Sequence, residues 1–252
     1  MGRICADCGR DLPRSSYTPN QFSKGGAFRW VAKGRYTEGG RRGQACVFKW
    51  FKTGTVFEDD YFTLDIKAVD KALEIVNRFN QLGIVDKAVK VNVPAVWRFE
   101  DDCDGDWAGT AHLIEPFVQN YQKFNSNSGW NDVSRPWALA MQALSHFSYH
   151  ISGGNYVLCD LQGGIYQQEV VLTDPVILSR TREYGVTDLG PKGISSFFSQ
   201  HECNQYCRSN WTAPANPVQH FVPVPGTSMM RRNVPAALSK PPVTEYAWSM
   251  LS

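Results

Sequence analysis

The stretch His201-Glu-Cys203-Asn-Gln-Tyr-Cys207 decides how the second half of this chain is organised. Imidazole nitrogen and thiolate sulfur are ligands that zinc prefers, and a structural zinc site takes four of them in a tetrahedron. The pattern predicts a helix from Ile194 to about Trp211, with His201 near its start. On such a helix Cys203 and Cys207, four positions apart, share one face. The stretch therefore predicts three of the four ligands of a buried structural zinc site.

The fourth ligand has to come from elsewhere in the chain. His146 and His150 lie in a segment, residues 134–150, that predicts a helix, and they share one of its faces. Spacing alone does not choose between them. The segment between His146 and His201 also holds the densest group of acidic, glycine and amide residues in the chain. A metal bound by these histidines and cysteines would hold the two ends of that segment in place.

The composition is that of an ordinary globular protein, with 252 residues that are 42% hydrophobic and 20% charged. No apolar run reaches the roughly 18 residues of a membrane span, and the N-terminal stretch does not resemble a signal peptide. Without a secretory signal, the seven cysteines are better interpreted as thiols or metal ligands than as disulfides. We therefore expect a protein of the cytoplasm or nucleus with no membrane partner.

The charge is unevenly distributed, although the net charge is only +2. Residues 1–52 carry eleven Lys and Arg against three Asp and Glu, whereas residues 53–106 carry six against twelve. A basic block suits a polyanion such as nucleic acid or a nucleotide's phosphates, and a solvated basic surface explains it equally well. The same block contains Cys5-x-x-Cys8, one half of a zinc ribbon without a second half nearby.

Strands dominate the first half of the chain and helices the second, which predicts an α+β, two-lobed architecture. A hairpin is expected over residues 27–52, with a central second strand, and an amphipathic helix over residues 64–82. Further strands are expected at 91–99, 110–118, 156–160 and 170–174, the last two as a hairpin-like pair. The predicted parts are an N-terminal extension, an N-terminal lobe, a C-terminal lobe with the zinc site and a Pro-rich irregular tail, over residues 1–24, 25–118, 119–211 and 212–252.

Four side chains suggest chemistry between these lobes. Lys49 lies in the middle of a strand that is apolar on both faces, so it needs an anionic partner or a route to solvent. Asp160 and Asp174 each follow an apolar strand, where a carboxylate emerges at the rim of a cleft, and Gln162 lies beside the first. Paired carboxylates and an amide suit magnesium. With the helix acid Glu74, these groups are the components of a phosphoryl-transfer site.

Several motifs occur in the order seen in the alpha-kinases, which the chain resembles over about residues 22–211. The motifs are Leu144-Ser-His146-Phe-Ser-Tyr, Leu158-Cys-Asp160-Leu-Gln162-Gly163, Thr173-Asp174-Pro175, Asp188-Leu-Gly190-x-x-Gly193 and His201-x-Cys203-Asn-x-x-Cys207, with the loop Asn125-Ser-Asn-Ser-Gly129 as a further element. The family includes myosin heavy chain kinases and elongation factor kinases.

The resemblance implies an atypical two-lobed protein kinase fold with ATP between the lobes and zinc in the C-terminal lobe. It implies that Lys49, assisted by Arg29, binds ATP phosphate, and that Glu115 lies on the inter-lobe strand whose backbone binds adenine. The resemblance further implies that Asp160 is the catalytic acid that positions the acceptor hydroxyl. It also implies that Gln162 and Asp174 are magnesium ligands. The resemblance also selects His146, rather than His150, as the fourth zinc ligand.

The expected function is therefore an ATP-dependent Ser/Thr protein kinase acting on a protein substrate. Two departures from the family pattern motivate an inactive nucleotide-binding pseudokinase as an alternative. Ala138 stands where many members have an arginine, for which Arg135 is a substitute, and the segment between Asp160 and Asp174 is long. A zinc-dependent nucleic-acid-binding module, based on Cys5-x-x-Cys8 and the basic block, is a third hypothesis. Nucleic acid is the less favoured partner.

Overall fold

The computed structural model describes residues 4–5, 22–23, 29–37, 39–51, 62–99, 101 and 108–227. Most of the predicted N-terminal extension, including Cys8, and the tail beyond residue 227 lie outside these ranges. No helix in the described ranges is long and apolar enough to cross a membrane.

The described residues form helices and strands that match most of the expected segments. The strands in the first half are β1 (Ile4–Cys5), β2 (Phe22–Ser23), β3 (Arg29–Arg35), β4 (Ala45–Phe51), β5 (Ala88–Val91), β6 (Ala95–Arg98) and β7 (Ala111–Pro116). Those in the second half are β8 (Tyr121–Lys123), β9 (Tyr156–Cys159), β10 (Gln162–Ile165), β11 (Glu169–Leu172) and β12 (Val176–Ser179). The helices are α1 (Thr63–Asn80), α2 (Pro136–Ile151) and α3 (Gly190–Gln200).

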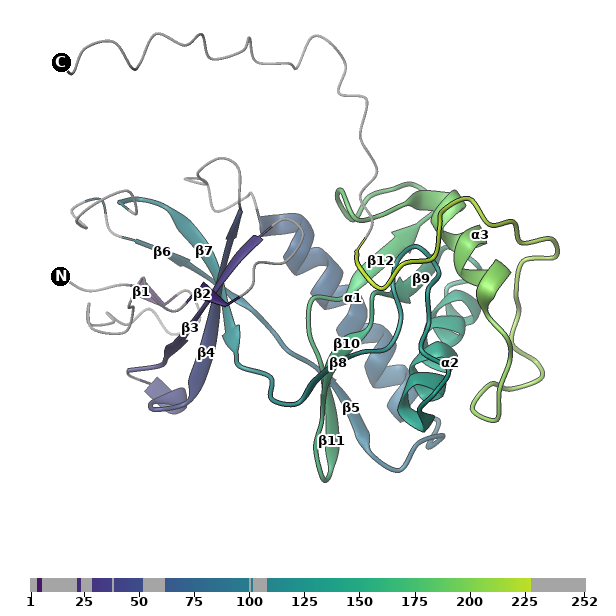
Figure 1. Ribbon diagram of the computed structural model, residues 1–252, viewed down its shortest axis with the longest axis horizontal. Coiled ribbons are helices and arrows are strands. Elements are labelled where there is room, and N and C mark those ends of the chain that lie inside the picture. Colours follow the sequence, from purple (N-terminus) through teal and green to yellow (C-terminus); the bar gives the residue numbers. More distant parts are fainter. Residues whose placement is uncertain are drawn as a thin grey trace, which may run out of the picture.

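A six-stranded sheet with the order β1-β6-β7-β4-β3-β2 makes up the N-terminal side of the molecule (Figure 1). β3 and β4 pair antiparallel from Arg29–Phe51 to Arg35–Ala45, so the predicted hairpin is confirmed. β4 also pairs with β7, which confirms its predicted central place in the sheet. Residues 46–49 of β4 are all buried, so both faces of the strand are covered, which accounts for the absence of a polar face in its sequence.

The C-terminal side contains two smaller sheets, with the orders β5-β11-β10-β8 and β12-β9. Two predictions are wrong here. The single strand expected over residues 91–99 is two strands, β5 and β6, in different sheets, because the chain crosses from one side of the molecule to the other at residues 92–94. The expected pairing of 156–160 with 170–174 does not form; β9 pairs with β12, and β11 pairs with the unpredicted β10.

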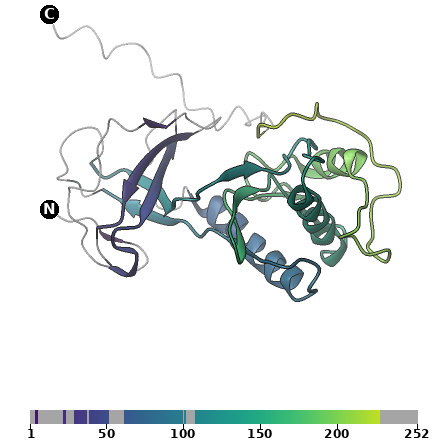
Figure 2. The same ribbon diagram turned by 60° about the horizontal axis from the view of Figure 1, so that its bottom comes forward.

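The largest hydrophobic cluster joins α1, α2 and the strands of the C-terminal side. α1 contributes an apolar stripe that includes Val69, Val76 and Phe79, all buried, as its amphipathic pattern predicts. Both views show α1 alongside β5 and α2 rather than inside the N-terminal sheet (Figures 1 and 2). The lobe boundary at residue 118 stays a prediction, although two elements that precede it pack into this C-terminal core.

The helix predicted over residues 194–211 is wrong in both its bounds. α3 begins at Gly190 and ends at Gln200, and His201 follows it in an extended conformation, so His201 is not near a helix start. Cys203 and Cys207 lie in an irregular segment and share no helix face. Residues 201–227 contain neither helix nor strand. The irregular tail over residues 212–252 stays a prediction, because the described ranges end at residue 227.

Candidate active site between the lobes and a metal cluster

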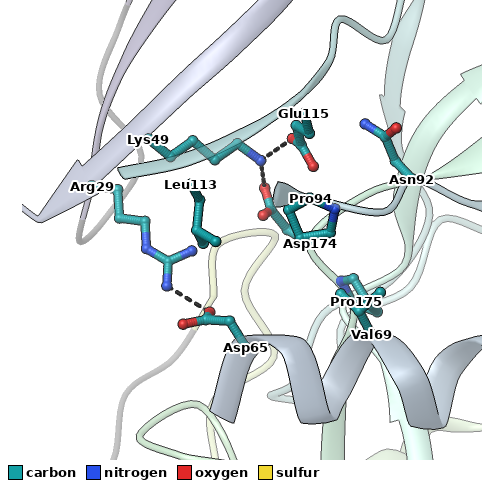
Figure 3. Close-up of a pocket in the computed structure, with 10 residues that line it drawn as sticks. All are labelled: Arg29, Lys49, Asp65, Val69, Asn92, Pro94, Leu113, Glu115, Asp174 and Pro175. Carbon is teal, nitrogen blue, oxygen red and sulfur yellow. Dashed lines mark hydrogen bonds and ion pairs between the residues drawn. The ribbon is translucent and has the colours of Figure 1, made fainter. Parts of the chain in front are cut away.

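A pocket lies where the six-stranded sheet meets α1 and the turn after β11 (Figure 3). Its charged lining comes from Arg29 on β3, Lys49 on β4, Asp65 on α1, Glu115 on β7 and Asp174 after β11. The remaining lining is Val69, Asn92, Pro94, Leu113 and Pro175. The topology thus brings four predicted site residues to one cavity, together with Asp65, which sequence reasoning did not single out.

Lys49 is the centre of this pocket. Its side chain is only 8% exposed, and its ammonium group donates to Glu115 Oε1 and, at 2.6 Å, to Asp174 Oδ2. Burial acts to lower the pKa of Lys49, but the charges of Asp174 and Glu115 outweigh it and raise the pKa above its usual value. A buried lysine in a strand was expected to need an anionic partner, and Lys49 has two, Glu115 and Asp174. The lysine stays charged in the cleft.

The two carboxylates around Lys49 differ in environment. Glu115 is buried and also accepts hydrogen bonds from Thr173 Oγ1, 2.9 Å from each of its oxygens. Burial raises the pKa of Glu115 despite the nearby Lys49 charge. The Asp174 side chain is 43% exposed. Partial desolvation in the pocket acts to raise its pKa, but the charges of Lys49 and Arg29 outweigh that effect and hold the pKa below its usual value. Asp174 is thus an ionised acid on the cleft side of Lys49, whereas Glu115 lies on its buried side.

Arg29 forms an ion pair with Asp65 Oδ1 at 2.5 Å, which links the N-terminal sheet to the first turn of α1. Figure 3 shows its guanidinium next to Leu113 and pointing toward Asp65. The helix acid expected to complete the site, Glu74, does not reach it: Glu74 pairs with Lys71 one turn away on the same helix. α1 contributes Asp65 instead.

Asp160 directly follows β9 and is buried. Its Oδ1 accepts a hydrogen bond from Lys123 at 2.8 Å, and its Oδ2 accepts one from Thr227 at 2.8 Å. Burial raises the pKa of Asp160, and the Lys123 charge counteracts that rise. The Gln162 amide also lies within hydrogen-bond distance of Asp160 Oδ2, at 3.5 Å. A buried carboxylate in such surroundings is able to hold a hydroxyl group and accept its proton.

Gln162 begins β10, and its Oε1 accepts hydrogen bonds from the Tyr121 hydroxyl and, at 2.8 Å, from Lys123 Nζ. The register of β8 with β10 places Lys123 opposite Gln162. Desolvation of its hydroxyl group, followed by the charges of Asp174, Asp160 and Glu115, raises the pKa of Tyr121. These groups therefore form one electrostatically connected site.

Lys123 and Tyr121 are site residues that the sequence analysis does not identify. They lie two apart on β8, so both point to the same face of the strand. The signal was the alternation Tyr121-Gln122-Lys123 just before the Asn125–Gly129 loop. A three-residue strand is too short for that alternation to be distinguished from a loop.

His146, His201, Cys203 and Cys207 form the second cluster, with one ligand atom of each residue within 4.8 Å of all the others. The distances are 3.2 Å from His201 Nε2 to His146 Nδ1, 3.6 Å from Cys203 Sγ to His146 Nδ1, and 3.8 Å from Cys207 Sγ to His201 Nε2. Ligand atoms around a tetrahedral zinc, with bonds of about 2.0–2.1 Å to nitrogen and 2.3 Å to sulfur, are about 3.3–3.8 Å apart. The four residues therefore fit zinc.

The surroundings of the cluster also fit a metal. His146 Nε2 lies 3.0 Å from the Thr212 carbonyl oxygen, which can only accept, so Nε2 carries the proton and the Nδ1 lone pair faces the cluster. Burial lowers the pKa of His201 to about 4, which keeps its imidazole in the neutral, ligating form. Burial raises the pKa of Cys207 to about 11, so a thiolate forms here only when a cation takes the place of the proton. His150 is not part of the cluster and lies near Thr212 instead.

Comparison with known proteins identifies relatives for most of the chain. The model of the alpha-kinase family matches residues 24–207. Alpha-protein kinase 1 of Dictyostelium discoideum is 33% identical over 173 residues, which is 68% of this chain and 12% of that protein. Human eukaryotic elongation factor 2 kinase is 38% identical over 108 residues, 41% of this chain and 14% of that protein. The chain thus spans a small part of the curated relatives that it matches.

A solved structure supports the same fold. The crystal structure of the alpha-kinase domain of myosin heavy chain kinase A in complex with AMP superposes with a TM-score of 0.66 and 22% sequence identity. The superposition covers 76% of this chain and 87% of that one. At this identity the likeness concerns the fold, which is the predicted α+β kinase architecture.

Proposed function

Because the chain belongs to the alpha-kinase family, we propose that it is an ATP-dependent protein kinase that transfers the γ-phosphate to a Ser or Thr hydroxyl of a protein. The observation that carries this proposal is the buried Lys49 between Glu115 and Asp174, in a cavity between the two sides of the molecule. A fixed positive charge at such a place suits the phosphates of a nucleotide. The AMP bound to the domain of myosin heavy chain kinase A supports a nucleotide as ligand.

The residues have separate roles in the proposal. Lys49 and Arg29 neutralise phosphate charge, and Glu115 holds Lys49 in place through its side chain. The backbone contact of the Glu115 strand with adenine stays a prediction. Asp160 orients the acceptor hydroxyl and accepts its proton. Positioning and charge stabilisation are the main contributions a protein makes to phosphoryl transfer.

Gln162 and Asp174 are the residues that would hold Mg²⁺, which when bound neutralises charge on the phosphates. Both offer oxygen ligands, and Mg²⁺ needs few protein ligands because it retains water. Lys49 and Lys123 now donate to these oxygens, so each lysine would turn from Asp174 or Gln162 toward phosphate oxygens when the nucleotide and its ion arrive.

Zinc has a structural role in this proposal. His146 lies on α2, and the other three ligands follow α3, so a bound zinc connects the segment after α3 to the helix that supports β9 and Asp160. A four-ligand site leaves no open position for catalysis. The chemistry therefore belongs to the cleft and not to the zinc cluster.

The test compares the wild-type chain with Asp160→Ala, using radiolabelled ATP and a basic protein substrate, with zinc measured by elemental analysis. We expect transfer to fall by about 100-fold to 10,000-fold, the usual contribution of an acid–base group, with one zinc per chain retained. Asp70→Ala, which removes an exposed acid of α1, is the matched control and keeps its activity. Transfer retained in Asp160→Ala contradicts the proposed role of Asp160.

Other outcomes favour the alternative functions. Binding of ATP by the wild-type chain without transfer to any protein would favour a pseudokinase. Zinc-dependent, strongly salt-sensitive binding to nucleic acid, without nucleotide binding, would favour the nucleic-acid module.

A further inference from the structure

The long segment between Asp160 and Asp174 folds as a hairpin of β10 and β11, with residues 167–168 at its tip. The Tyr166 amide donates to the Glu169 carbonyl at 2.8 Å and closes the tip. β8 pairs with the outer edge of β10, and β5 pairs in parallel with the outer edge of β11 (Figure 1). Because both edges are paired, the hairpin is a fixed part of the C-terminal side and not a free loop.

Tyr166 connects the tip of this hairpin to the linker, residues 117–120, which joins β7 of the N-terminal sheet to β8. Its hydroxyl oxygen accepts a hydrogen bond from the Gln119 amide at 2.9 Å. The next residue, Asn120, has a left-handed backbone with φ of 52°, a conformation that persists where the surroundings hold it. The Tyr166 hydroxyl therefore holds the end of the linker directly before its turn into β8.

Gly164 shows how closely the hairpin and the linker approach each other. A Cβ on this residue would lie 2.3 Å from the Gln119 carbonyl oxygen and 2.9 Å from Val118 Cγ1. It would also lie 3.0 Å from Cε2 of the Tyr166 ring. The linker and the tyrosine ring thus occupy the space that a side chain at residue 164 would need. Glycine is required here because the linker backbone lies against the strand.

Other contacts hold the start of the linker. The Pro116 carbonyl, at the end of β7, accepts from Asn92 Nδ2 at 2.8 Å, and the Phe117 amide donates to the Ala45 carbonyl of β4 at 2.9 Å. Asn92 belongs to the other crossing between the two sides of the molecule, residues 92–94. The start of the linker is therefore held by the N-terminal sheet and the other crossing, and its end by Tyr166.

The opposite end of the hairpin carries the proposed magnesium ligands. Gln162 begins β10, and Asp174 follows β11 by two residues. The Thr173 amide donates to the Gln162 carbonyl at 2.9 Å, which keeps the two strands together at this end. One rigid hairpin thus contacts the linker at its tip and presents the proposed metal ligands at its base.

We propose that Tyr166 is a positioning residue for the base of the nucleotide. This inference rests on the proposed kinase function and on the predicted contact of adenine with the backbone of the Glu115 strand. The linker continues that strand, so a linker held against the hairpin keeps the base in a fixed place relative to Gln162 and Asp174. The long hairpin then supports nucleotide binding and is no reason for an inactive pseudokinase.

The proposal separates the base from the phosphates. Lys49 and Arg29, the proposed phosphate ligands, lie on β4 and β3 and make no bond to the hairpin tip. Loss of the Tyr166 hydroxyl should therefore loosen the place of adenine and leave the phosphate contacts as they are. A general loss of structure would weaken both.

The experiment compares the wild-type chain with Tyr166→Phe, which keeps the ring and removes the hydroxyl. Binding of ATP with Mg²⁺ is measured by calorimetry, and tripolyphosphate with Mg²⁺ is measured as its competitor. We expect ATP to bind about 2-fold to 10-fold more weakly, the usual effect of one neutral hydrogen bond, with the affinity for tripolyphosphate unchanged. In a kinase assay KM for ATP should rise by the same factor, with kcat retained.

Tyr156→Phe is the matched control, since its hydroxyl donates to Glu183 Oε1 at 3.5 Å, away from the linker. It should bind both ligands as the wild type does. Gly164→Ala tests the close approach from the other side, because the added methyl pushes the linker from the hairpin. If this variant keeps a cooperative melting transition, it should weaken ATP more than tripolyphosphate; if it does not fold, Tyr166→Phe decides alone.

The outcomes distinguish this inference from the proposed function. Unchanged ATP affinity in Tyr166→Phe, or equal weakening of ATP and tripolyphosphate, overturns the positioning role and leaves the kinase function standing. A wild-type chain that neither binds ATP nor transfers its phosphate overturns the proposed function, and the inference with it.

Discussion

Asp160 and Asp174, the two acids on which the proposed chemistry depends, both have left-handed backbone conformations, with φ of 58° and 48°. Aspartate tolerates this region better than most residues, but it remains sparsely populated outside glycine. Each acid ends the run of an apolar strand, and the left-handed turn changes the direction of the chain at the carboxylate. Such positions are concentrated where function constrains the backbone, which agrees with a role for both acids.

The ionisation of Asp160 leads to a prediction at this scale. Burial raises the pKa of Asp160, and the Lys123 charge partly opposes that rise. Lys123→Met removes the opposing charge, so the pKa rises further and the carboxylate is protonated over more of the acidic range. Because the proposed role needs the ionised form, we expect the acidic limb of the kcat/KM profile to move to higher pH.

The measurement is the pH dependence of kcat/KM for the wild-type chain and the variant. Lys87→Met, at a lysine that donates to the Gln167 carbonyl away from the cleft, is the control and should leave the limb in place. A limb that stays in place or moves to lower pH in Lys123→Met argues against Asp160 as the titrating base.

At the scale of the element, the hairpin of β10 and β11 fixes Gln162 next to Asp160. Gly163, opposite Leu172 in the register, leaves no room for a side chain, since a Cβ there would lie 1.9 Å from the Val171 carbonyl oxygen. The contact is with backbone, which cannot move without opening the hairpin. Glycine is therefore required here for close approach of two strands.

Gly163→Ala should lower the free energy of unfolding by about 1–3 kcal/mol or more, the usual cost of overpacking, and weaken nucleotide binding by displacing Gln162. Urea unfolding and a nucleotide titration measure the two effects. Gly40→Ala, where the added methyl meets nothing within 4 Å, is the control and should change stability by less than about 0.5 kcal/mol. Equal stability of the two variants would contradict the close packing.

The hydrogen bonds that follow the end of α3 explain why Cys203 and Cys207 do not lie on the predicted helix. Asn204 accepts a hydrogen bond from the Tyr206 amide at 3.0 Å and donates to the Leu139 carbonyl at 3.1 Å. An asparagine that bonds to nearby backbone competes with the helix. The ligand run therefore folds back toward α2. The spacing of the ligands predicted the cluster but not the conformation of the chain between them.

At the scale of the whole molecule, the metal cluster lies where distant parts of the C-terminal side meet. His146 packs edge-on against Phe198 of α3 and Trp211 of the irregular segment, and Trp211 also contacts Phe147. His146 thus joins α2 and α3 to the segment that leads to Thr227. Loss of the metal should loosen this junction.

Removal of zinc by a chelator, or Cys207→Ser, should lower the melting temperature, because a bound metal stabilises only the folded state. A loss of about 3 kcal/mol corresponds to roughly 6–12 °C for a domain of this size. Calorimetry with elemental analysis measures both effects. Adding zinc back should restore the melting temperature of the chelated wild type but not of Cys207→Ser. An unchanged melting temperature after complete zinc loss would contradict a structural role.

The sequence by itself determined the types of residue and the local periodicities: the hairpin of β3 and β4, helices α1 and α2, three of the four residues of the metal cluster, and the acids that follow β9 and β11. These depend on short stretches of chain, so they can be recognised without distances. The choice of His146 over His150 came from the family resemblance, and the cluster contains His146.

Only the tertiary structure decided which of these residues meet. Lys49 and Asp174 are 125 positions apart, and their contact depends on how the N-terminal sheet packs on the C-terminal core. The same holds for Lys123 and Thr227 beside Asp160, and for Asp65 in place of Glu74. The physical reason is that long-range contacts follow from the packing of whole elements, which no local pattern of residues encodes.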